Sequence, residues 1–149
     1  MHVAAMTGQT KVFQTMLQKA VDKNPKDDNW DTPLHSAAKG GHYTICKLII
    51  DAGIGDKNPS NINGETPLHS AAEGGHYTIC KLIIDSGIRD KNPKSKSDET
   101  PLELATVNNH GEVCLLILES VGSVVLWWKN GFLSYKSDLL KQRKRRHTD

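Results

Sequence analysis

The chain has 149 residues, of which 37% are hydrophobic and 24% are charged. This composition excludes a wholly disordered chain, and the length predicts one domain with at most a tail. The eight aromatic residues (three Trp, three Tyr and two Phe) are few for the core of a sandwich or barrel. A formal net charge of +2 does not by itself indicate a nucleic-acid partner.

The charge is unevenly distributed along the chain. Residues 136–149 contain six Lys or Arg and two Asp, which gives +4 and leaves −2 for residues 1–135. The longest apolar runs are much shorter than the roughly 20 residues that span a bilayer, and the N-terminus lacks the pattern of a signal peptide. We therefore expect no membrane segment. Because three cysteines cannot all pair with one another, we also expect a cytoplasmic or nuclear chain.

An internal repeat with a period of 34 residues organises most of the sequence. Residues 30–63 and 64–97 agree at 25 of 34 aligned positions. A partial unit over residues 1–29 precedes them, and a more divergent unit over about 98–120 follows. We therefore expect a repeat domain over 1–120 and an atypical segment with a basic tail over 121–149.

Each unit is predicted to contain two helices and a loop. Thr66 is a favourable N-cap, and Pro67 suits the first helical position, where a missing N–H costs nothing. Gly75 supplies the left-handed residue that ends this helix. A second, largely aliphatic helix is predicted over 77–86 and ends before Gly87, and a turn-rich loop is predicted over 90–99. Since one unit cannot bury its own apolar faces, neighbouring units should stack.

The pattern Thr-Pro-Leu-His-Ser-Ala-Ala, followed by Gly-Gly-His and an aliphatic helix, occurs at 32–42 and 66–76 and in weakened form at 100–110. It resembles the ankyrin repeat. The resemblance implies an all-α solenoid of stacked helix-turn-helix units with β-hairpin-like loops, or fingers. It also implies binding of another protein through the fingers and the concave face of the first helices. The last copy departs from the pattern, because Glu103 and Thr106 replace the histidine and the second alanine.

The cysteines and histidines do not indicate a catalytic or metal-binding site. The three cysteines recur at one repeat position, and the 8–10 Å between packed helices suits neither a disulfide nor a zinc site. We expect them to be small buried hydrophobic residues. Six of the seven histidines also occupy repeat positions, where hydrogen bonding to nearby backbone or a neighbouring loop is the better interpretation. We therefore expect no enzyme, no cofactor, no metal and no small-molecule substrate.

Positions that differ between copies are the candidates for partner recognition. On the first helix one position holds Met6, Lys39, Glu73 and Val107 in successive units, and the resemblance places it on the concave groove. The fingers also differ between units. The candidate partner-binding residues are Trp30, Lys39, Asn61, Ile62, Glu73, Lys94, Lys96 and Val107. Two alternatives are that Trp30 packs against the adjacent finger and that the variable positions are ordinary solvent positions.

The C-terminal segment carries separate expectations. Leu115 replaces a lysine of the earlier units, which predicts that something covers the last helix pair. Residues 121–135 hold four aromatic residues around a hairpin signal at 129–131, and we expect them to form a cap. The alternatives are an exposed docking patch and a poorly ordered terminus.

The basic tail comprises Lys141, Arg143, Lys144, Arg145 and Arg146. Such a run serves as a nuclear-import signal, makes nonspecific phosphate contacts, or is simply solvated. The leading hypothesis is a monomeric, non-enzymatic protein-interaction module or scaffold, with another protein as its partner. The alternative is a nuclear factor that associates with nucleic acid through the tail, although nucleic acid is not the partner we expect.

Overall fold

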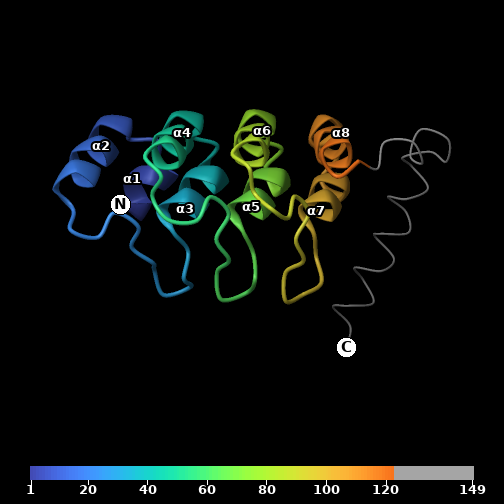
Figure 1. The fold of residues 1–149 in the computed structure, drawn as a ribbon, viewed down its shortest axis with the longest axis horizontal. Helices are drawn as coiled ribbons and strands as arrows, with labels where there is room; N and C mark the ends of the chain where they lie inside the picture. The colour runs from blue at the N-terminus through green and yellow to red at the C-terminus, as the bar shows by residue number, and fades with distance from the viewer. Residues whose placement is uncertain (123–149) are drawn as a thin grey trace.

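The computed structural model describes residues 1–122, and within them the fold consists of eight helices without a strand. The helices form two rows, and the loops that follow the second helices extend past the first-helix row (Figure 1). The first helices are α1 (His2–Met6), α3 (Pro33–Gly40), α5 (Pro67–Glu73) and α7 (Pro101–Val107). The second helices are α2 (Thr10–Lys19), α4 (Tyr43–Asp51), α6 (Tyr77–Asp85) and α8 (Gly111–Ser120). The expected all-α repeat fold is confirmed.

Each unit packs against its neighbours along the stack. Successive first helices contact one another, as do successive second helices, and the two helices of a unit contact each other. The alanine pairs of α1, α3 and α5 are buried, as is Ala105 of α7, which lets neighbouring backbones approach closely. Aliphatic side chains of the second helices complete one continuous core. This arrangement explains why a chain with few aromatic residues still buries a core.

The predicted start of the first helix is present in the structure. Thr66 has extended backbone angles, φ −117° and ψ 164°, and Pro67 is the first helical residue of α5. The Thr66 side chain and the His69 ring form a reciprocal capping box with each other's backbone amides. In α7 the same box forms with Glu103 in the place of histidine. The helix start therefore survives this change of residue, because both side chains offer an acceptor to the N-cap amide.

The turn between the two helices depends on a left-handed residue. Gly41 and Gly75 have φ of 76° and 70°, as predicted for Gly75, and Asn109 takes φ 65° at the equivalent position. A Cβ at Gly41 would lie only 2.7 Å from Cε1 of His76, in the next unit. Glycine is needed there both for its backbone angle and for the histidine that packs over it.

The cysteines are buried in the second helices, as expected. Cys46 and Cys80 are fully buried and Cys114 is 1% exposed, and all three are free thiols. Burial raises the pKa of both Cys46 and Cys80 to about 12. These thiols are therefore protonated at neutral pH and behave as small apolar groups.

At the C-terminal end of the stack, Leu115 is 50% exposed. The expected cap over 121–135 and the basic tail lie almost entirely outside the described residues, so both stay predictions.

Candidate functional site

Three loops, which we call the first, second and third fingers, span residues 26–31, 60–65 and 94–99. In each finger one polar side chain accepts hydrogen bonds from two backbone amides, two and four residues later, at 2.9–3.2 Å. These acceptors are Asp27, Asn61 and Ser95. Backbone amides of the second and third fingers donate to carbonyls of the preceding finger at 3.0 and 2.8 Å. The fingers therefore share one hydrogen-bonded frame and are tied to one another.

Buried histidines connect the first helices to these fingers. Nδ1 of His35 accepts from the amide of Thr32 at 3.0 Å, and its Nε2 lies 3.2 Å from the carbonyl of Glu65. His69 makes the equivalent contacts one unit later, with the Glu99 carbonyl 3.1 Å away. Since Nδ1 accepts, the proton is assigned to Nε2, which donates to the carbonyl. Burial lowers the pKa of both histidines, so they are neutral at pH 7 and fix each finger to the preceding helix.

A groove of about 330 Å³ lies between the first helices and the first two fingers. It brings together three of the predicted residues: Lys39, Asn61 and Glu73. Residues from both fingers and from four first helices complete the lining, and these are Met6, Asp27, Asp31, His35, Ser36, Glu65, His69, Ser70 and Leu104. The geometry thus joins the concave helix face and the fingers in one site.

Asn61 supports the groove from within. It is only 9% exposed, and its amide nitrogen donates to Asp31 Oδ1 at 2.9 Å and to Glu65 Oε2 at 3.1 Å. Its side-chain oxygen is the turn acceptor of the second finger. Both ends of the side chain are therefore engaged in linking the two fingers, which leaves Asn61 little capacity to contact a partner directly.

The groove is acidic. Four carboxylates line it, those of Asp27, Asp31, Glu65 and Glu73, against the single ammonium group of Lys39, which leaves a net charge of −3 while the histidines are neutral. Within residues 1–122 neither Lys39 nor Glu73 takes part in an ion pair. The finger carboxylates were not among the residues predicted from the sequence. The available signal was the acidic residue that precedes each Thr-Pro pair, at Asp31, Glu65 and Glu99.

Trp30 stands beside this groove on the first finger. Its side chain is 56% exposed, so packing against the next finger does not bury it. The Nζ of Lys26 lies 5.0 Å from the centre of the ring, within the range of a cation–π contact. Trp30 also has φ of 62°, in the left-handed region, whereas glycine occupies the equivalent position of the second finger at Gly64.

The remaining predicted residues lie outside the groove lining. Ile62 is 37% exposed on the second finger. Lys94 pairs with Asp98 within the third finger at 2.8 Å, and the Lys96 side chain is exposed. Val107 is half-buried at the end of α7. The five tail residues between 141 and 146 fall outside the described part of the chain.

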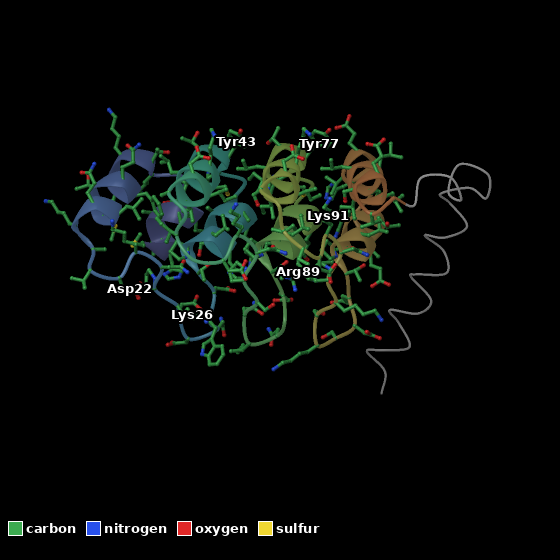
Figure 2. All side chains as sticks on the ribbon, viewed as in Figure 1. Asp22, Lys26, Tyr43, Tyr77, Arg89 and Lys91 are labelled. Atoms are coloured by element: carbon green, nitrogen blue, oxygen red, sulfur yellow. The ribbon has the colours of Figure 1, made fainter. Side chains whose placement is uncertain are left out.

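The second-helix face lies on the side of the stack opposite the groove. Figure 2 shows Tyr43 and Tyr77 on the second-helix row, away from the first finger, where Lys26 lies. Lys47–Asp51 and Lys81–Asp85 ion pairs repeat on this face at 2.7 and 2.9 Å, with exposed side chains.

Among residues 1–122 no group of three or more His, Cys, Asp or Glu is arranged to hold a metal ion. No helix in the same range is long and apolar enough to cross a membrane.

Comparisons with known proteins agree with this architecture. A family model described as ankyrin repeats (many copies) matches residues 1–50, and one described as ankyrin repeats (3 copies) matches residues 54–125. Protein phosphatase 1 regulatory subunit 12A of Mus musculus is 44% identical over 52 residues, which are 34% of this chain and 5% of that protein.

Two further relatives carry ankyrin repeats in their names. The putative ankyrin repeat protein FPV223 of fowlpox virus is 40% identical over 50 residues, 34% of this chain and 36% of the relative. Human ankyrin repeat domain-containing protein 39 is 34% identical over 50 residues, 34% of this chain and 27% of the relative. The chain thus matches only between 5% and 36% of the length of these relatives. Ankyrin repeats are generally protein-interaction modules, and the two family models together cover most of the sequence. The chain belongs to the ankyrin repeat family.

Proposed function

We propose that this chain is a monomeric, non-enzymatic interaction module that binds another protein in the groove between its first helices and first two fingers. One observation carries the proposal. Lys39 and Glu73, the first-helix residues that differ between two otherwise nearly identical units, meet the variable fingers in a single groove. Sequence variation and concave shape therefore coincide at one place on the stack.

The rigidity of the fingers supports binding at this site. Their turns are closed by side-chain acceptors, and His35 and His69 fasten the finger ends to the first helices. A surface that is already ordered loses little conformational entropy when a partner docks. The mouse relative is named a regulatory subunit of protein phosphatase 1, and a regulatory role exercised within a protein complex fits an interaction module.

Paired charge swaps test the proposal without changing the net charge. The groove variant is Lys39→Glu with Glu73→Lys. The control is Lys47→Glu with Asp51→Lys, which inverts an exposed ion pair on the opposite, second-helix face. Both variants should keep the wild-type melting temperature, because exposed charges contribute little to stability.

The readout is affinity capture from cell extract with quantitative mass spectrometry. We expect proteins whose recovery falls at least about tenfold with the groove swap and stays within about twofold with the control swap. Equal recovery with both variants, or loss with the control swap alone, would place the binding surface elsewhere and contradict the proposal.

A further inference from the structure

We infer that the groove selects a cationic partner segment, one that presents arginine or lysine side chains to the carboxylates of the first two fingers. This inference rests on the proposed function and specifies its partner class. Its starting point is the imbalance between four lining carboxylates and one lining lysine. An imbalance of this kind inside a concave site favours partners of opposite charge, because the walls focus the field.

The carboxylates retain unused acceptor capacity. Asp31 and Glu65 each use one oxygen to accept from Asn61, and no described residue donates a hydrogen bond to the other oxygen of either side chain. The Glu73 carboxylate has no hydrogen-bond or ion-pair partner within residues 1–122. A planar guanidinium group carries five donors, and carboxylate oxygens that accept no other hydrogen bond are its preferred acceptors.

Apart from Lys39, no side chain that lines the groove offsets this negative charge. His35 and His69 contact the finger carbonyls through Nε2 and add no positive charge at neutral pH, since burial lowers the pKa of both rings. Asn61 is neutral and holds Asp31 and Glu65 on either side of its amide. The fold therefore uses a neutral bridge to keep two carboxylates together at the groove wall.

Trp30 adds an independent reason to expect a cation. It lies between Asp27 and Asp31 in the chain, and its exposed ring already attracts the ammonium group of Lys26 at 5.0 Å. Arginine stacks on tryptophan more often than lysine does. A guanidinium that reaches the first finger would therefore find carboxylate acceptors and an aromatic face together. An acidic segment or a nucleic-acid backbone would meet repulsion at the same place.

The test uses the full chain and two fluorescein-labelled peptide probes of equal length, hexa-arginine and hexa-glutamate, read by fluorescence anisotropy at low ionic strength. The groove variant is Glu65→Gln with Glu73→Gln. The matched control is Asp51→Asn with Asp85→Asn, which removes the same charge from the second-helix face. All variants carry the same basic tail, so any competition from it is equal in each comparison.

We expect hexa-arginine to bind wild type at least about tenfold more tightly than hexa-glutamate. The groove variant should weaken hexa-arginine binding roughly tenfold, and the control should change it less than about twofold. Equal losses in the two variants would show attraction to net charge alone and overturn the inference, as would tighter binding of hexa-glutamate. Either result, together with captured proteins whose recovery falls with the groove swap and not with the control swap, would refute the partner class and leave the interaction module standing.

Discussion

The first and second fingers have the same backbone and offer different side chains. In both, the residue at the second position accepts from the amides two and four residues later, and the fifth residue takes a left-handed conformation. That fifth residue is Trp30 in the first finger and Gly64 in the second. Glycine adopts a positive φ without steric cost, whereas a bulky residue there costs about 1 kcal/mol or more.

The difference between Trp30 and Gly64 shows that a finger contains positions that set its shape and a position that only presents a side chain. The hydrogen-bonded frame, which includes Asn61 and the histidine contacts, sets the shape of the fingers. The left-handed position does not contribute to that frame through its side chain, so it is free to carry an exposed tryptophan despite the backbone cost. Strain of this kind at an exposed aromatic residue favours a binding role for Trp30.

The largest effect should come from protonation of the frame histidines. Because burial lowers the folded-state pKa of His35 and His69, the unfolded chain binds more protons than the folded chain below pH ~6.5. Stability is therefore complete above that pH and falls as the pH drops, by up to about 1.4 kcal/mol per pH unit for each histidine.

Thermal unfolding of the full chain between pH ~7.5 and ~5.5 measures this loss. The variant His35→Gln with His69→Gln keeps an acceptor for the capping box and cannot titrate. Its melting temperature should be lower at neutral pH and nearly flat across the window. A wild-type slope that persists in this variant would show that other groups cause the acid sensitivity.

Replacing Asn61 with alanine should break the link between the first two fingers. The change removes the acceptor for two backbone amides and the donor that separates Asp31 from Glu65. We expect a loss of about 2 kcal/mol in urea unfolding, because buried polar groups are left unsatisfied. Asn63→Ala, at an exposed position two residues later, is the control and should cost less than about 0.5 kcal/mol. Similar losses in the two variants would contradict the structural role of Asn61.

Placing tryptophan in the second finger tests the backbone cost directly. At Gly64 the angle φ is 72°, and a Cβ would lie 3.1 Å from the backbone nitrogen of Lys96. Gly64→Trp should therefore lower the free energy of unfolding by about 1–2 kcal/mol. A melting temperature equal to wild type would mean that the left-handed position carries no cost and that Trp30 is not strained.

The reverse change, Trp30→Gly, should leave stability almost unaltered. Relief of about 1 kcal/mol of backbone strain is offset by the greater freedom of glycine in the unfolded chain and by loss of the Lys26 contact, each worth about 0.5 kcal/mol. Recovery of the captured partner should nevertheless fall at least about tenfold, since exposed tryptophans are common binding anchors. Unchanged recovery would remove Trp30 from the binding surface.

The sequence predicted the framework well because its determinants are local. Thr66, Pro67, Gly75 and Asn109 act through their own backbone angles and near neighbours, so their roles can be read along the chain. The buried cysteine column could be predicted because the period places it on successive packed helices. The left-handed angle at Trp30 could also have been predicted, because the same repeat position holds Gly64 and Asp98 in the other units.

The groove was predicted only in part, since its composition depends on distances between fingers. Lys39 and Glu73 were found through variation within one column. The roles of Asp31 and Glu65 follow from the Asn61 amide between them, a contact that joins positions 30 and 4 residues apart. Linear spacing does not show whether such side chains lie close together. Asn61 was chosen because its position differs between units, and the structure shows it buried between Asp31 and Glu65.

Hydrogen–deuterium exchange of the chain with and without its captured partner tests the central claim most directly. We expect added protection in the first two fingers, 26–31 and 60–65, and in α3 and α5, with little change in α4 and α6. Protection confined to α4 and α6, on the side of Tyr43 and Tyr77 in Figure 2, would contradict it.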